Sequence, residues 1–348
     1  MTVDFPTLVT ALSMAGIPIA GVIAAAFIML KPGRRGCRRW RTVRRVLLSR
    51  RIWLHSSSLL DFQYLLAGAL TYSVVFAYTL LTGVSVSKAV TTGLTGWLGP
   101  HETPEYLPIY LKGLIILGLY LSFELAYWVD HFLSHKIAFL WEFHKVHHSA
   151  AVLTPFTNYR VHPVDTILYL NIQTLFIGIA SGLIQYFAGD AFSLLSTAIC
   201  ALLFALYMAL WGHLQHSQFW ISFTGLAGRI FLSPAHHQIH HSRNPIHFDK
   251  NFGAGLALFD WLFGTLHIPQ RQNEHLRFGT ENDAHLKQLV PSVVYPFNRA
   301  TKQLIALLPK GKSTSEAIPS QAGPESSQPP SLRGVGGHEG PITEGIHA

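Results

Sequence analysis

The chain is poor in charged residues and almost free of cysteine. Of its 348 residues only 13% are charged, whereas a soluble domain usually carries about 25%. Together with a hydrophobic share of 49%, this excludes a wholly soluble protein and a disordered one. The two cysteines, Cys37 and Cys200, offer neither a disulfide framework nor a CxxC metal site. The 18 acidic residues are outnumbered by 20 histidines, and this excess of imidazole in an apolar chain requires an explanation.

Long runs without charge predict membrane-spanning helices, because about 20 apolar residues suffice to cross a bilayer. The first run lacks the basic start of a signal peptide and exceeds the usual apolar core of one. Only Asp190 separates the last two runs, so they are predicted to form an antiparallel hairpin over 166–212. The sequence thus predicts an all-α integral membrane protein with about four to five transmembrane helices. The predicted spans are 7–30, 62–87, about 106–128, 166–189 and 191–212.

Basic residues predict the orientation of these spans. Ten of the 26 Lys and Arg residues lie within 31–51, between two apolar runs. This position favours a cytoplasmic loop that faces anionic lipid over a nucleic-acid site. With this loop inside, 84–105 is an external loop, and the histidines of 131–162 and from 213 onward lie on the cytoplasmic side. The predicted parts are N-terminal transmembrane helices over 1–128, a histidine-box catalytic domain over 129–310 and a disordered tail over 311–348.

Half of the 20 histidines follow short repeated patterns. Spacings of three and four residues place side chains on one face of a helix. Two HxxHH motifs and one HxxxH supply eight imidazoles, more than the four ligands of a tetrahedral zinc ion, so they predict two metal ions. Imidazole favours Fe, Zn, Cu or Ni, and the scarcity of carboxylates argues against a carboxylate-bridged pair. The motifs are HxxxH at 131–135, HxxHH at 144–148, HxxH at 213–216 and HxxHH at 237–241.

Six segments together resemble the fatty acid hydroxylase/sterol desaturase superfamily of integral-membrane histidine-box enzymes. They read HFLSH at 131–135, HKVHH at 144–148, YRVHP at 159–163, GHLQHS at 212–217, HHQIHH at 236–241 and DWLFGT at 260–265. The resemblance covers about 121–267. It implies a helical bundle in the membrane with a cytoplasmic histidine-rich helical cap. It also implies O2-dependent hydroxylation or desaturation of a lipid by two iron ions.

The resemblance also implies roles for individual residues. No catalytic residue is expected beyond the metal ligands, and no Rossmann, haem or cytochrome-like segment is present. The implied ligands are His131, His135, His144, His147, His148, His213, His216, His237, His240 and His241. The expected partners of their other ring nitrogens are His162, His236, Asp130, Asn158, Asp165, Asn244 and Asp260, although His236 could itself be a ligand.

The favoured function is O2-dependent hydroxylation of a membrane lipid, with fatty-acyl, ornithine-lipid or sterol-like substrates as candidates. A desaturase and a carotenoid or ether-lipid monooxygenase remain alternatives. A metal transporter is a remote one, because the uncharged spans contain no histidine. Electrons are expected from a separate partner: a ferredoxin, a cytochrome b5-type protein or a reductase. We expect no nucleic-acid partner. The expected location is a bacterial inner membrane with the active site facing the cytoplasm, and the endoplasmic reticulum is the alternative.

Overall fold

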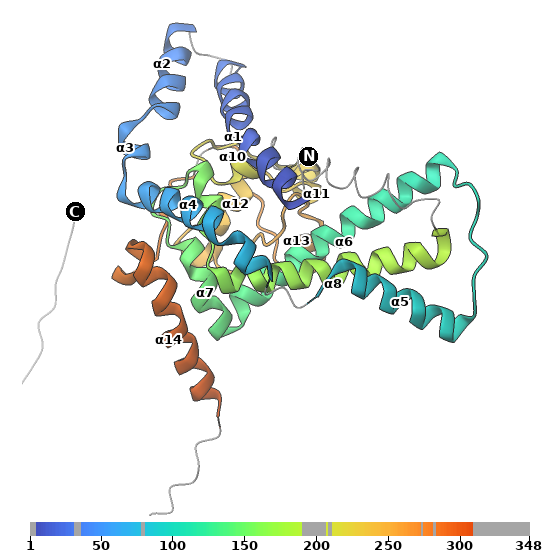
Figure 1. Ribbon diagram of the computed structural model, residues 1–348. Helices are drawn as coiled ribbons and strands as arrows, with labels where there is room; N and C mark the ends of the chain where they lie inside the picture. The colour runs from blue at the N-terminus through green and yellow to red at the C-terminus, as the bar shows by residue number, and fades with distance from the viewer. Residues whose placement is uncertain are drawn as a thin grey trace, which may run out of the picture. The chain divides into compact units, whose positions relative to one another are not determined.

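A computed structural model describes residues 5–30, 36–77, 81–189, 207, 211–272, 274–280 and 283–308, all of which belong to the unit formed by residues 1–308. Throughout this described part the secondary structure is helical (Figure 1), apart from an isolated β-bridge between Phe231 and Leu256. The predicted disordered tail lies outside the described residues, as does most of the predicted span 191–212.

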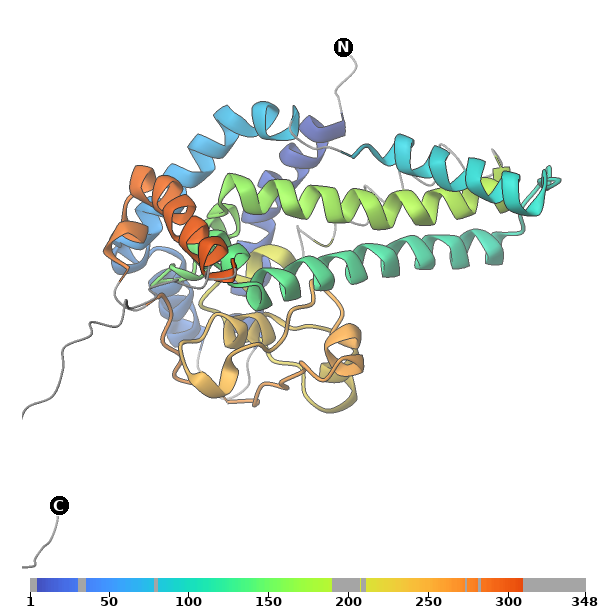
Figure 2. The same ribbon diagram turned by 90° about the horizontal axis from the view of Figure 1, so that it is seen from below.

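Two long apolar helices run side by side in opposite directions (Figures 1 and 2). They are α6 (Ile109–Lys136) and α8 (Pro163–Ala188), and both are long and apolar enough to cross a membrane. Only 17% of the apolar stretch of α6 and 11% of that of α8 is buried in the isolated chain, whereas the core helix of a soluble protein is mostly buried. Helices therefore occupy the predicted spans 106–128 and 166–189. Because α6 continues to Lys136, it carries the HxxxH motif on its last turns, as the sequence predicts.

The structure does not show one continuous helix over the predicted span 62–87, nor a loop without a helix over the predicted external segment 84–105. Helix α4 (Ser56–Ala77) ends inside the predicted span, and α5 (Gly83–Leu98) begins after it. Thr82 starts this second helix, because its hydroxyl oxygen accepts the backbone N–H of Ser85 at 3.1 Å. Helix α5 then packs along α8, so a segment without a long apolar run still forms a stable helix.

Small residues allow α5 and α8 to approach closely. A Cβ atom on Gly182 would lie 2.6 Å from the Cβ of Val90 and 2.7 Å from the carbonyl oxygen of Ser87. A Cβ on Gly178 would lie 2.6 Å from the Cβ of Val86. Thr91 adds a hydrogen bond from its hydroxyl to the carbonyl of Gly182 at 3.1 Å. This is the small-residue contact that brings helices together within membranes.

We expect the change Gly182→Ala to lower the free energy of unfolding by about 1–3 kcal/mol, because the added methyl group overlaps Val90. Gly118→Ala on α6 is the matched control, since a Cβ there meets nothing within 4 Å and both variants gain the same helix propensity. Unfolding in detergent micelles measures the difference. Equal midpoints for the two variants would contradict the close contact of α5 and α8.

The N-terminal part contains further helices. Helix α1 (Phe5–Leu30) occupies the predicted span 7–30. The basic segment 31–51, which the sequence predicts as a loop, is helical where it is described, in α2 (Gly36–Leu47) and α3 (Arg50–Trp53).

The remaining helices of the described part are short, apart from α14, and several of them carry histidines. Helices α7, α12 and α14 lie at the end of the α6–α8 pair where α6 ends (Figure 2). In chain order the elements are α7 (Ala138–His148), η1 (Pro155–Tyr159), α10 (His213–Gln215), α11 (Gly225–Ile230), α12 (Pro234–His240), η4 (Pro245–His247), α13 (Leu258–Leu262), η5 (Ala284–Lys287) and α14 (Leu289–Leu307).

Candidate metal centre

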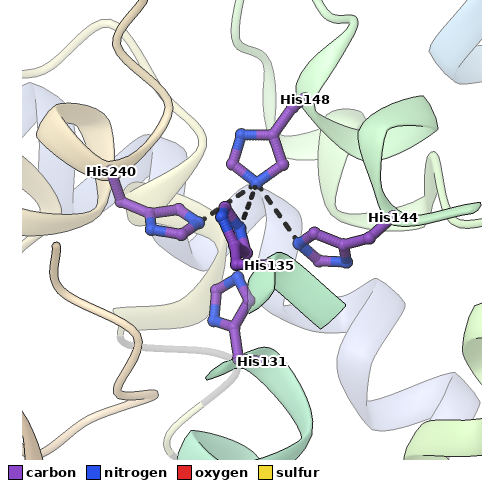
Figure 3. A group of neighbouring side chains, drawn as sticks. All are labelled: His131, His135, His144, His148 and His240. Carbon is purple, nitrogen blue, oxygen red and sulfur yellow. Dashed lines mark hydrogen bonds between the residues drawn. The ribbon is translucent and has the colours of Figure 1, made fainter. Parts of the chain in front are cut away.

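Nine of the ten predicted ligands form two groups of imidazoles. Within each group the candidate ligand nitrogens all lie within 4.8 Å of one another. The rings of the larger group come from α6, α7 and α12 and converge on a common centre (Figure 3). The five-histidine group consists of His131, His135, His144, His148 and His240, and the four-histidine group of His147, His216, His237 and His241.

In the five-histidine group, acceptors outside the group fix the orientation of the rings. A ring that donates its Nδ1–H to an oxygen keeps the lone pair of its Nε2 free for a metal ion. Three rings have this arrangement. His131 donates to the carbonyl of Phe252 at 2.8 Å, His144 to the Oδ2 of Asp165 at 3.0 Å, and His240 to the carbonyl of Lys250 at 2.8 Å.

The inward Nε2 atoms of this group are close together. The Nε2 of His148 lies 3.1 Å from that of His135, 3.1 Å from that of His240 and 3.2 Å from that of His144. Two nitrogens bound at right angles to one metal ion at about 2.1 Å lie about 3.0 Å apart. The Nε2 of His131 is buried and has no hydrogen-bond partner. Unprotonated nitrogens at these separations fit a shared cation better than hydrogen bonds to one another.

The four-histidine group has the same compact geometry. The Nε2 of His216 lies 3.1 Å from that of His147, 3.1 Å from that of His241 and 3.0 Å from that of His237. His147 donates its Nδ1–H to the carbonyl of Arg160 at 3.2 Å. All four side chains are buried, so the group can exclude water from a bound ion.

Burial keeps these imidazoles neutral. Desolvation, with a contribution from the neighbouring His144, lowers the pKa of His147 to about 3. Desolvation and nearby imidazoles also lower the pKa values of His148, His216 and His240 well below the usual value. Neutral imidazole is the form that binds a metal ion, so these side chains are ready to bind one at physiological pH.

Each HxxHH motif supplies ligands to both groups. The histidines at i and i+4 of each motif belong to the same group, whereas the histidine at i+3 belongs to the other group. His144 and His148 thus join the five-histidine group and His147 the four-histidine group. In the last motif, His240 joins the five-histidine group, whereas His237 and His241 belong to the other. Adjacent histidines therefore link the two groups, and the rings of His148 and His241 stack with centroids 4.4 Å apart.

Two of the predicted partners support the ligands, but only one of them does so by a direct hydrogen bond. Asp165 accepts the hydrogen bond of His144 directly. Asp260 acts one step further out, because its carboxylate accepts the backbone N–H groups of Phe252 and Gly253 at 2.8 Å. It thereby fixes the loop whose Phe252 carbonyl orients His131.

The other predicted partners make no hydrogen bond to either group. His236 accepts the N–H of Ser233 at Nδ1 and donates from Nε2 to the carbonyl of Gly228 at 3.1 Å, so neither ring nitrogen is left for a metal ion. His162 caps α8 through its Nδ1 and donates from Nε2 to the carbonyl of Val293 at 2.8 Å. The remaining three have other positions: Asp130 is buried, Asn158 lies on η1, and Asn244 caps η4.

His213, the tenth predicted ligand, belongs to neither group. Its ring is fully buried on α10 and lies 6.2 Å from the ring of Tyr159. His247 and His267, which belong to none of the histidine motifs, lie next to each other with ring centroids 5.1 Å apart, also outside both groups.

Sequence reasoning missed a buried ion pair behind the four-histidine group. Asp61 on α4 lies 2.8 Å from the Nε of Arg160, and both side chains are almost completely buried. The second oxygen of Asp61 accepts the hydroxyl groups of Thr154 and Thr157 at 3.1 and 2.6 Å. Because the carbonyl of Arg160 orients His147, this network supports one candidate ligand. An acidic residue directly before an apolar run was the available signal.

Glu124 was also missed. Its carboxylate, buried within α6, accepts the backbone N–H groups of Gly255 at 3.1 Å and of Leu256 at 3.0 Å. Glu124 and Asp260 thus hold the same loop, from Phe252 to Leu256, at both ends. The signal in the sequence was an acidic residue inside a predicted span, where ionisable groups are expensive and commonly functional.

A cavity of about 350 Å³ opens along α6. Its lining residues on α6 share a helix face with Glu124, Tyr127 and His131, because they follow the same spacing of three and four residues. The cavity is therefore in line with the five-histidine group. It is lined by Gly113, Ile116, Leu117, Tyr120 and Tyr207.

Comparison with known proteins finds one matching family and several similar enzymes. The fatty acid hydroxylase family model matches residues 116–265, which include every member of the two histidine groups. Ornithine lipid hydroxylase OlsE of Rhizobium tropici is 29% identical over 67% of this chain and 69% of its own length. The alkylglycerol monooxygenase of Danio rerio is 30% identical over 42% of this chain, and the Delta(7)-sterol 5(6)-desaturase ERG3A of Gibberella zeae is 26% identical over 42%. No solved structure shows a significant match to the chain.

The extent of these matches differs. The chain covers only 29% of the Danio rerio enzyme and 35% of the Gibberella zeae enzyme, against 69% of the Rhizobium tropici enzyme. The apolar helices and the similarity to lipid-modifying enzymes indicate association with a membrane and a lipid substrate. Residues 116–265 thus match the fatty acid hydroxylase family, and the similarity to an ornithine lipid hydroxylase and to alkylglycerol monooxygenases indicates an oxidoreductase of the monooxygenase type.

Proposed function

We propose that this protein hydroxylates a membrane lipid with O2 at a centre of two iron ions, one in each histidine group. The observation that carries the proposal is the presence of two adjacent, buried sets of converging imidazole nitrogens with few carboxylates around them. Two ions bound in this way would supply the reduction of O2, with electrons from a separate donor, to an oxidant that removes hydrogen from a C–H bond. Iron suits an imidazole site that performs O2 chemistry, whereas zinc has no redox chemistry.

The chain itself orients the ligands and excludes water. The Phe252 and Lys250 carbonyls and the Asp165 carboxylate hold three rings of the five-histidine group with Nε2 inward. Eight of the nine side chains are buried and His135 is partly buried, so bulk water that would quench a reactive oxidant is kept away. The role of His213 as a tenth ligand remains a prediction.

The cavity along α6 suits the apolar part of a lipid. Its lining is mainly apolar, and it lies on the helix face that ends at His131, so a chain lying in it would direct a carbon atom toward the five-histidine group. The relative of which the chain covers 69% is an ornithine lipid hydroxylase, and this supports a polar bacterial lipid as substrate. The alkylglycerol monooxygenases support an ether lipid as the second candidate.

Desaturation is the alternative reaction, and the similarity to a sterol desaturase favours it. Both reactions begin by removing hydrogen from a C–H bond. Insertion of an oxygen atom then gives an alcohol, whereas loss of a second hydrogen gives an alkene. The position of the C–H bond relative to the metal decides between them.

We also propose the arrangement in the membrane. The basic segment 31–51 supports a cytoplasmic position for the histidine groups, with four to five spans in total. In this arrangement 1–128 anchors the chain, 129–310 forms the catalytic domain and 311–348 is a tail. The location is a bacterial inner membrane, or alternatively the endoplasmic reticulum. A ferredoxin, a cytochrome b5-type protein or a reductase supplies electrons from the cytoplasmic side.

Lipid analysis of cells with and without the gene product tests the proposed reaction. We expect a lipid whose mass has increased by one oxygen atom, and its fragments name the modified carbon. A lipid that has lost two hydrogens would instead identify the desaturase. Unchanged lipids, together with metal uptake into proteoliposomes without O2 consumption, would contradict both and favour a transporter.

A further inference from the structure

Large apolar side chains are exposed on two short helices beside α6. The exposed fractions are 72% for Leu226, 53% for Trp261 and 68% for Leu262. Phe231 and Phe263, which directly follow α11 and α13, are about half exposed. Together these five residues form the α11–α13 patch. A cluster of exposed apolar side chains indicates a surface that another apolar phase covers.

The two helices form one unit. They contact each other. The segments next to them are joined by two backbone hydrogen bonds of 2.9 Å, from Leu232 N–H to the Gly255 carbonyl and from Ala257 N–H to the Ile230 carbonyl. The patch is therefore a fixed surface of the fold.

The patch is continuous with α6. The ring of Phe263 stacks on Trp128 with centroids 4.5 Å apart, and Trp128 donates its indole N–H to Asp260 at 3.2 Å. Trp128 lies three residues before His131, near the end of the apolar stretch of this membrane-type helix. Helix α13 thus lies at the level where the predicted span ends.

The charges of the patch also fit a lipid surface. Across 225–231 and 257–264, the only acidic residue is Asp260, which is fully buried, and the only basic residue is the exposed Arg229. Tryptophan and phenylalanine beside a single arginine are typical of segments that lie in the headgroup region of a bilayer.

We propose that the α11–α13 patch inserts into the leaflet that faces the histidine groups and lies beside α6 at the level of Trp128. This goes beyond the proposed function, because it concerns the surface on which the domain rests and holds whatever lipid reacts. It has a consequence for the site. Asp260 on α13 accepts the backbone N–H of Phe252, and the Phe252 carbonyl orients His131. The same residue therefore connects the proposed lipid-contacting helix with the position of a candidate metal ligand.

Spin labelling of the full chain in liposomes of phosphatidylethanolamine and phosphatidylglycerol tests this proposal. The natural cysteines Cys37 and Cys200 are replaced, and a nitroxide is attached after Leu262→Cys or, as a second position, Leu226→Cys. The matched controls are Leu117→Cys on the exposed face of α6 and Arg271→Cys in the exposed polar segment 270–272. Power saturation compares the access of O2, which concentrates in lipid, with that of a water-soluble nickel complex.

We expect the labels at 262 and 226 to behave like the one at 117, with nickel accessibility several-fold lower than at 271 and high O2 accessibility. Nickel accessibility equal to that at 271 would overturn the proposal. Protection from both reagents would also overturn it, because a protein surface would then cover the patch. Metal content equal to that of the unlabelled protein shows that each labelled variant is folded.

Discussion

Replacing His240 by alanine should remove one metal ion and leave the other. His240 belongs to the five-histidine group and its neighbour His241 to the four-histidine group, so each single variant empties a different site. We expect the iron content of His240→Ala and of His241→Ala to fall from two ions to about one ion per chain. Lipid oxidation should fall to background in both, because both ions are needed for the reaction.

Metal analysis of the purified variants after anaerobic loading with ferrous iron measures this prediction, and the two single-site proteins should have different iron spectra. His275→Ala is the control, since His275 is exposed and lies in neither group. Full activity in either ligand variant, or an unchanged iron content, would show that the group assignment is wrong.

The change Asp61→Asn should have the second-largest effect, although Asp61 binds no ligand. It leaves the buried guanidinium of Arg160 without its countercharge, and breaking a buried ion pair from one side costs about 3–5 kcal/mol. Because the Arg160 carbonyl orients His147, we also expect the four-histidine group to bind metal about 10–100-fold more weakly. The five-histidine group should keep its affinity.

Denaturant unfolding and metal titration of the same preparations separate the two effects. Lys136→Gln is the control, because it breaks an exposed ion pair with Asp249, and such pairs contribute about 0–1 kcal/mol. If Asp61→Asn weakened both metal groups equally, the network would serve general stability and not the position of His147.

Local patterns in the sequence predicted which histidines come together, because spacing along a helix determines which side chains share a face. The HxxxH motif lies on α6 as predicted, and both HxxHH motifs lie on helices, with their last histidines at or directly after the helix end. The division of each motif between two groups was not predictable, since it depends on how α7 and α12 face each other. Adjacent histidines point in different directions, and only the tertiary structure shows that His148 and His240 meet.

Hydropathy alone located α6 and α8 but not α5. The uncharged run 62–87 continues through the segment between α4 and α5, so no charged residue in the sequence indicates that one helix ends and another begins there. The helix of 83–98 depends on the Thr82 cap and on close contact with Gly178 and Gly182, and such contacts between distant residues leave no periodic pattern.

The supports of the centre were the least predictable part. Asp61, Glu124 and the Phe252 carbonyl each act through long-range contacts that link segments about 90 to 130 residues apart. A backbone carbonyl in particular has no signature in a sequence. The match to the family begins at residue 116, so Asp61 lies outside the matched region even though it supports His147.

The most direct test of the central claim is the origin of the oxygen in the lipid product. Cells that produce the wild-type chain or the His240→Ala variant are grown under ¹⁸O2, and their lipids are compared by mass spectrometry. The account predicts a lipid in the wild-type cells that carries one ¹⁸O atom from the gas and is missing from the variant cells. An unlabelled oxygen in the new lipid, or the same labelled lipid in the variant, would contradict it.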